Sequence, residues 1–279
     1  TEIYTLSLHD ALPILIVLSP FDLAAAALLI LCLAGLSLRM RLGVELQLLT
    51  SAARSTVQLF LIGLVLKVLF DNAHPLWVAL LAGVMIAVAG REVMVRQKRR
   101  FIGWWGFGVG TLSMFVSSFT VTIMALLLVI GTTPWYAPQY AIPLLGMILG
   151  NTMNGISLGL DRLTQDATQK RPIIETRLAL GQSWQRAISD SRREAIRVGL
   201  IPIINAMSAA GIVSLPGMMT GQILAGTPPV EAVKYQILVM FLIAGGTGFG
   251  TVVAVSFAAR RLFDERQRLR LDRLSASRN

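Results

Sequence analysis

The chain has 279 residues, of which 54% are hydrophobic and 14% are charged. A soluble domain usually carries about 25% charged residues, so this composition excludes an ordinary soluble protein and predicts that lipid is the main solvent. The net charge of +10 lies in short clusters between long apolar runs, which is typical of membrane proteins and excludes a nucleic-acid partner.

Residues 1–14 differ in character from the rest of the chain. They show no helical or strand period, and their composition does not match the apolar run that follows. We interpret them as a non-native segment, such as a translated sequencing adapter joined to a truncated gene start, and leave them out of the expected fold. A signal peptide is the alternative, but the segment has no basic beginning and no small-residue cleavage site.

Seven apolar segments approach the length that a helix needs to cross a bilayer, which is about 20 residues. In chain order they are 15–38, 46–70, 75–94, 104–130, 140–160, 198–225 and 235–259. Pro202 and Pro216 predict an interruption of the sixth segment. The sequence therefore predicts an all-α, polytopic integral membrane protein of about seven transmembrane helices, with a permease domain over residues 15–262.

The distribution of positive charge predicts the orientation. The loops after the first, third, fifth and seventh segments hold almost every Lys and Arg, whereas the loops after the second, fourth and sixth hold only Lys234. Lys and Arg accumulate on the cytoplasmic side of membrane proteins. We therefore expect the N-terminus outside and a basic tail, residues 263–279, in the cytoplasm, with the protein in the inner or plasma membrane.

The longest charged stretch, residues 161–197, interleaves apolar and charged residues as short amphipathic helices at a membrane surface do. Glu175 stands six residues before Gly181, and this glycine is expected to end the first of these helices and to turn the chain. The spacing resembles the EAA-type coupling motif of ABC permeases, in which the loop seats a helix in a groove of the ATP-binding subunit. From the residues alone, a solvated connector is the alternative.

Three further runs carry a wider resemblance. They are Gly146-Met-Ile-Leu-Gly-Asn151, Leu178-Ala-Leu-Gly181 and Val213-Ser-Leu-Pro-Gly-Met-Met219. These runs resemble those of the FetB-type permeases, and the resemblance covers the chain from about residue 20 to 262. This family is linked to metal export and includes the plant aluminium-tolerance membrane subunits.

This resemblance implies a permease that exports iron or another metal ion. It would work as a dimer bound to two copies of a separate ATP-binding subunit, with Glu175, Leu178 and Gly181 as partner-coupling residues. Gln182 follows Gly181 where the family commonly has Ala. This departure predicts altered partner contacts at that turn.

Arg54 is the most costly residue in the predicted membrane region. It lies about two turns into the second segment, where an unpaired cation costs about 2.5–3.5 kcal/mol. One interpretation places it on a polar transport pathway together with Gln58, one turn away. The other pairs it with Glu45 or Asp161, or lets it reach the interface.

Amides and methionines supply the remaining pathway candidates. Asn151 and Asn154 share a face of the fifth segment, and Asn205 lies in the sixth. They either line a water-filled route or hydrogen-bond between helices. Met218 and Met219, beside a Pro-Gly break, are either soft metal ligands or fillers of apolar gaps.

Several chemistries lack the residues that they need. No Gly-x4-Gly-Lys-Ser/Thr loop is present, and the glycine-rich run 245–250 has no lysine, so ATP would have to be hydrolysed by a partner chain. Cys32 is the only cysteine, and His9 and His74 are the only histidines, so the sequence identifies no metal ligands. We expect no bound cofactor and no catalytic role. The alternative to an ABC permease is a stand-alone channel or secondary transporter for a small ion or solute. An intramembrane enzyme would need a catalytic pair within the membrane, and the predicted segments contain none.

Overall fold

The computed structural model describes residues 19–71, 74–131 and 133–275. The expected non-native segment 1–14 lies outside the described residues. Within them the chain is helical and forms no β-strand. The prediction of an all-α, polytopic membrane protein is confirmed.

All seven predicted segments form helices. The helices are α1 (Pro20–Met40), α2 (Glu45–Asp71), α3 (Pro75–Arg96), α4 (Trp104–Met114), η1 (Phe115–Phe119), α5 (Thr120–Met124), η2 (Ala125–Ile130), α6 (Pro138–Gln169), α7 (Arg171–Ala179), α8 (Trp184–Ala187), α9 (Ser189–Ala209), α10 (Gly217–Leu224), α11 (Pro229–Arg261) and η3 (Leu271–Arg273). From α4 to η2 the helix is continuous, with two π-helical stretches. In the described residues, six helices are long and apolar enough to cross a membrane, namely α1, α2, α3, 105–130, α6 and α11.

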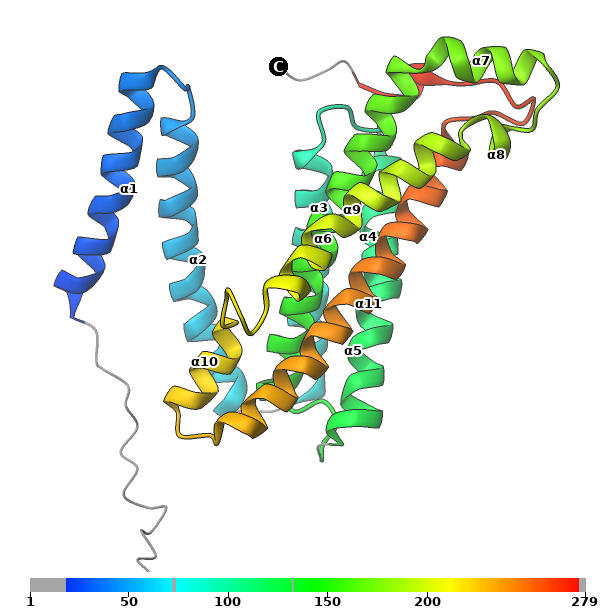
Figure 1. The fold of residues 1–279 in the computed structure, drawn as a ribbon. Coiled ribbons are helices and arrows are strands. Elements are labelled where there is room, and N and C mark those ends of the chain that lie inside the picture. Colours follow the sequence, from blue (N-terminus) through cyan, green and yellow to red (C-terminus); the bar gives the residue numbers. More distant parts are fainter. Residues whose placement is uncertain (1–18, 72–73, 132, 276–279) are drawn as a thin grey trace, which may run out of the picture.

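The sixth predicted segment is two helices, and its bounds differ from the expectation. α9 begins at Ser189, inside the predicted charged loop, and Pro202 lies within it without ending it. The break falls instead at residues 210–216, where Gly211 has a φ of 85° that favours glycine. Together α9 and α10 lead from the end of the bundle near α8 toward the opposite end, where α11 begins (Figure 1).

The centre of the bundle is formed by α6, α9 and α11. Gly155 on α6 and Gly199 on α9 lie face to face, and a Cβ added at Gly199 would come 2.6 Å from the carbonyl oxygen of Gly155. A Cβ at Gly155 would meet Thr247 and Thr251 of α11 at 2.7 and 2.8 Å. Small residues of this kind let membrane helices approach closely, and here they join all three helices.

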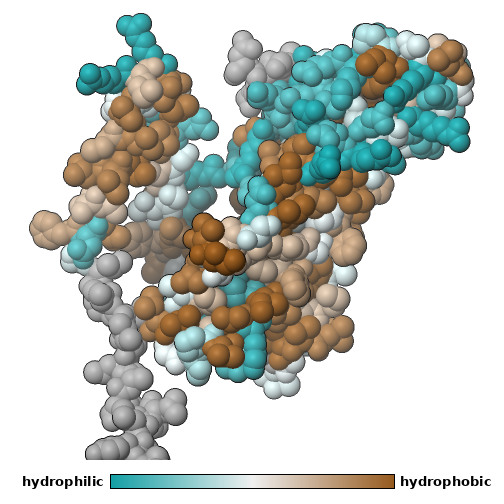
Figure 2. Space-filling model, viewed as in Figure 1, coloured by the Kyte–Doolittle hydropathy of each residue, from teal (hydrophilic) through white to brown (hydrophobic). Residues whose placement is uncertain are grey.

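The two ends of the bundle differ in polarity. We call the end that carries α7, α8 and residues 263–275 the α7 end, and the opposite end the α10 end. Hydrophilic side chains gather at the α7 end, whereas hydrophobic ones cover much of the rest (Figure 2). The α1–α2 hairpin stands apart, because α1 packs on α2 and α2 makes few contacts with the bundle (Figure 1).

Candidate transport cleft and coupling surface

A cleft of about 720 Å³ opens between α2, α3 and α6. Most of its lining is apolar, including Met85 and Met153. Arg54 and Gln58 of α2 also line it, so the structure brings these two predicted pathway residues together. Glu92 and Arg96 of α3 complete its polar part.

The polar side chains of the cleft form one connected network. Arg54 Nη2 lies 2.5 Å from Glu92 Oε1, and Arg96 Nε lies 3.9 Å from Glu92 Oε2. Arg96 Nη1 donates a hydrogen bond of 2.6 Å to Asn154 Oδ1 on α6. The Glu92 side chain is only 16% exposed, so the two arginines offset the cost of placing its charge in the cleft. The network ties α2, α3 and α6 together.

The predicted partners of Arg54 were wrong. Glu45 accepts a hydrogen bond from Ser37 Oγ, and Asp161 accepts one from the backbone amide of Lys98. Neither carboxylate pairs with Arg54, whose partner is Glu92. Sequence reasoning missed Glu92 because it lies near the end of its predicted segment and was not considered as a residue within the membrane. Its four-residue spacing from Arg96 was the available signal.

The other predicted pathway residues lie elsewhere. The Asn151 side chain donates to the Met147 carbonyl oxygen within α6, at 2.9 Å. Asn205 is an exposed residue of α9. On α10, Met218 is 36% exposed and Met219 is buried. None of these four residues lines the cleft between α2, α3 and α6.

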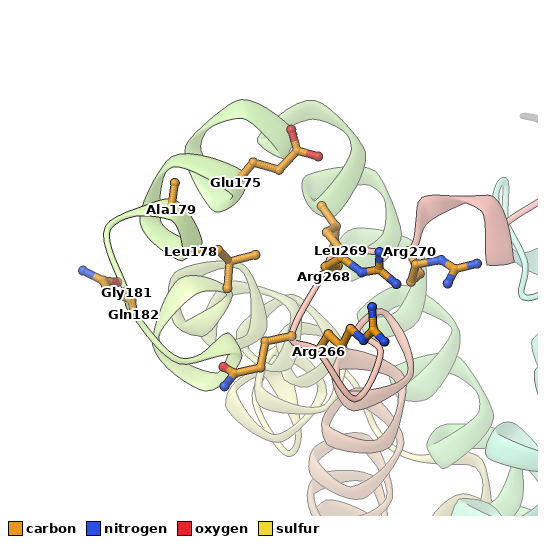
Figure 3. Close-up of a pocket in the computed structure, with 10 residues that line it drawn as sticks. Glu175, Leu178, Ala179, Gly181, Gln182, Arg266, Arg268, Leu269 and Arg270 are labelled. Carbon is orange, nitrogen blue, oxygen red and sulfur yellow. The ribbon is translucent and has the colours of Figure 1, made fainter.

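A second cavity, also of about 720 Å³, brings the three predicted coupling residues together (Figure 3). Glu175 and Leu178 come from α7, and Gly181 follows it with a φ of 82°. Residues 266–270 form the opposite wall and contribute three arginines. Leu178 points toward this wall (Figure 3). Glu175 forms an ion pair of 2.7 Å with Arg171 on its own helix.

Residues 263–275 form a folded hairpin against α8. Phe263 and Leu269 form an antiparallel bridge, and the Trp184 amide donates to Gln267 Oε1 at 2.9 Å. The Trp184 ring lies 5.7 Å from the Phe263 ring and 5.2 Å below the Arg260 guanidinium. The C-terminal hairpin, as we call residues 263–275, therefore joins the predicted coupling loop to the end of α11.

Two aspartates hold the coupling region in place. The Arg177 guanidinium donates to Asp190 Oδ2 at 2.8 Å, which links α7 to α9 and, with its charge, lowers the pKa of Asp190. In the C-terminal hairpin the Arg268 backbone amide donates to Asp264, and the Arg268 side chain adds a second hydrogen bond. Chiefly through that amide, the pKa of Asp264 lies below its ordinary value.

The described residues contain no group of three or more His, Cys, Asp or Glu that could hold a metal ion. The cleft instead offers one carboxylate that is already paired, amide oxygens and the thioethers of Met85 and Met153. Such a lining does not suit a tight, dehydrated metal site.

Comparison with known proteins gives a consistent result. A family profile described as "Uncharacterised protein family (UPF0014)" matches residues 20–263. A UPF0014 membrane protein of Synechocystis is 40% identical over 226 residues, which cover 80% of this chain and 85% of that protein. The "Probable iron export permease protein FetB" of Escherichia coli is 32% identical, with 89% of this chain and 93% of that protein covered.

A plant relative shows the same breadth of similarity. The Arabidopsis thaliana protein named ALUMINUM SENSITIVE 3 is 31% identical over 231 residues, which cover 83% of this chain and 82% of that protein. No solved structure matches the chain. The similarity to known proteins is therefore one of sequence. The family profile covers the cleft and α7 and α8, whereas residues 266–270 lie beyond it.

Proposed function

This chain belongs to the UPF0014 family of membrane proteins, and we propose that it is the permease subunit of an ABC transporter. Two copies would work with two ATP-binding subunits. The cargo would be iron or another metal ion, moved outward through the cleft between α2, α3 and α6. The name of the relative from Escherichia coli supports the substrate class and the direction.

The coupling surface is the observation that carries this proposal. α7 and α8 lie across one end of the bundle (Figure 1). Apolar side chains are exposed on α7 and directly after it, with Ile173 54% and Leu180 77% exposed. α7 follows α6 directly, and the Arg177–Asp190 ion pair joins it to α9. A displacement of α7 by a docked ATPase would thus reach two of the three helices at the centre of the bundle.

ATP would act through the partner alone. The sequence has no P-loop, and so this chain would bind no nucleotide cofactor of its own. The α7 end, which carries the basic loops, would face the cytoplasm, and the start of α1 would face outward. This orientation places the coupling surface where a cytoplasmic ATPase can bind it.

The experiment is reconstitution. The chain is co-expressed with a candidate ATP-binding subunit from the same genome, purified through a tag on the permease, and placed in vesicles. We expect the ATPase to co-purify and Fe²⁺ transport to require both ATP and the partner. Transport without any ATPase subunit would contradict the proposal.

One observation favours a second candidate, a stand-alone secondary transporter. A proton-coupled carrier needs an ionisable relay within the membrane, and Arg54 and Glu92 place such groups in the cleft. In the same vesicles, this candidate predicts transport that follows a pH gradient and does not respond to ATP. One vesicle preparation therefore distinguishes the ABC permease from the secondary transporter.

A further inference from the structure

The break between α9 and α10, residues 210–216, lies in an unusual place for irregular backbone. Figure 1 shows it between the two ends of the bundle, at the level of the middle of α2 and α11. The α10 helix separates it from the turn that leads into α11. Irregular backbone at membrane depth is found only where protein buries it or where it lines water, because lipid offers no hydrogen-bond partner.

Only some of the backbone N–H and C=O groups of this break form hydrogen bonds within its own turn. The Gly211 amide donates to the Ser214 carbonyl oxygen at 2.9 Å, and the Val213 amide donates to Ala209 at 3.0 Å. In the part of the chain that the structure describes, the amides of Ile212 and Leu215 have no acceptor. The carbonyl oxygens of Gly211 and Ile212 likewise receive no donor there.

The side chains of the break are apolar and point away from the protein. Ile212 is 91% exposed, Val213 is 83% exposed and Leu215 is 62% exposed. Hydrophobic side chains cover the break and its surroundings on this face (Figure 2). These side chains do not suit the wall of a water-filled route, and the unpaired backbone groups do not suit lipid. The remaining cover is protein, and the described part of this chain does not supply it.

We propose that residues 210–216 form a twofold interface with the same residues of a second copy of this chain. An isologous interface must be complementary to itself, and the break offers both unpaired donors and unpaired acceptors within a few residues. Ile212 and Val213 of each copy would pack against the break of the other. The proposal rests on the proposed assembly of two permease chains and names the surface that joins them.

The test is disulfide cross-linking in the membranes of the producing cells, with the full-length chain. Cys32 is exposed and is the only cysteine, so the background is Cys32→Ala. Val213→Cys is compared with Val116→Cys. Val116 is 49% exposed in η1, which continues α4 on the other side of α11 from the break (Figure 1).

We expect an oxidant to cross-link Val213→Cys to a dimer at least about fivefold more than Val116→Cys. Ile212→Cys serves as the second variant if Val213→Cys accumulates poorly. Equal cross-linking at positions 213 and 116 would overturn the proposal. So would labelling of Val213→Cys by a charged, membrane-impermeant thiol reagent without cross-linking, which would make the break part of a water-lined route.

A second measurement separates this surface from the proposed assembly. Two copies of the chain with different tags are expressed together and purified through one tag. Co-purification without cross-linking at position 213 would support the dimer but overturn the proposal that residues 210–216 form its interface. Failure of the tags to co-purify would overturn both, whereas absence of an ATP-binding partner would overturn the proposed function but leave a cross-linked pair in place.

Discussion

Arg54 of α2 and Glu92 of α3 form an ion pair across the cleft, with 2.5 Å between Nη2 and Oε1. The pair matters because the α1–α2 hairpin makes few other contacts with the bundle. It therefore holds one wall of the cleft against another. Arg96 and Asn154 extend the same network to α6, so that a movement of one of the three helices strains its contacts with the other two.

Loss of one partner of this pair should harm transport more than protein accumulation. Arg54→Gln leaves Glu92 with Arg96 alone, and Glu92→Gln leaves Arg54 as an uncompensated cation, which costs about 2.5–3.5 kcal/mol within a membrane. We expect each single variant, and Arg54→Ala, to lower vesicle transport about tenfold. The double variant should recover part of the loss, because it removes the cation that Glu92→Gln leaves unpaired at position 54, while Arg96 keeps its hydrogen bond to Asn154.

Lys67→Gln is the matched control, since Lys67 is an exposed cation of the same helix that forms no ion pair with the described residues. Membrane amounts are compared by immunoblot. Equal loss of transport and of accumulation in Arg54→Ala would contradict a role in the pathway and point to a structural one.

Hydropathy located the helices well, because burial in lipid depends on the composition of each segment and not on its neighbours. The pairing of Arg54 with Glu92 could not be read in the same way, since the two residues are 38 positions apart and only tertiary packing brings them together. The break of the sixth segment shows a similar limit. Pro202 removes one hydrogen bond and the helix continues, whereas residues 210–216 leave the helical conformation altogether.

The coupling surface was predicted in part. Glu175 and Gly181 were recognised by their spacing and Leu178 by the run that resembles the FetB-type permeases, and the structure brings all three into one cavity. The opposite wall of that cavity was not foreseen, because the arginines of residues 266–270 indicated only a solvated basic tail. Leu269 and Leu271, which alternate with charged residues, were the signal that this segment packs on the protein.

The close approach of α6 and α9 predicts a sharp difference between two glycines of the same helix. Gly155→Ala places a Cβ 2.9 Å from the Gly199 carbonyl oxygen, and overpacking of this kind costs about 1–3 kcal/mol. Gly150→Ala meets no atom within 4 Å. We expect the first variant to lower the thermal unfolding temperature of the purified protein and the second to leave it unchanged. Equal changes of the unfolding temperature in the two variants would contradict a role for the close contact between α6 and α9.

The C-terminal hairpin should respond to acid only at low pH. The pKa of Asp264 is lowered in the folded protein, so its contribution is fully present above the unfolded value of about 3.9 and is lost as the pH falls through the lower folded value. We expect limited proteolysis to leave the hairpin intact between about pH 8 and pH 5. Asp264→Asn should expose it at every pH, whereas Glu265→Gln, at an exposed neighbour, should not. A hairpin that opens near pH 6 would contradict this assignment.

Gly181 provides the sharpest test of coupling, because the chain offers a glycine with the same backbone strain at the other end of the bundle. Gly181 has a φ of 82° and Gly226 a φ of 93°, and neither has an atom within 4 Å of an added Cβ. Alanine in this region costs about 1–2 kcal/mol at either site, so the two variants should lose similar stability. We expect Gly181→Ala to uncouple ATP hydrolysis from transport, Gly181→Asn to retain more coupling because asparagine tolerates this conformation, and Gly226→Ala to transport normally.

Glu175→Gln should resemble Gly181→Ala, since both lie at the cavity that we assign to the ATPase. The measurement is the ratio of ions moved to ATP hydrolysed in vesicles. Co-purification of the ATPase at unchanged yield together with normal transport in Gly181→Ala would refute the coupling role.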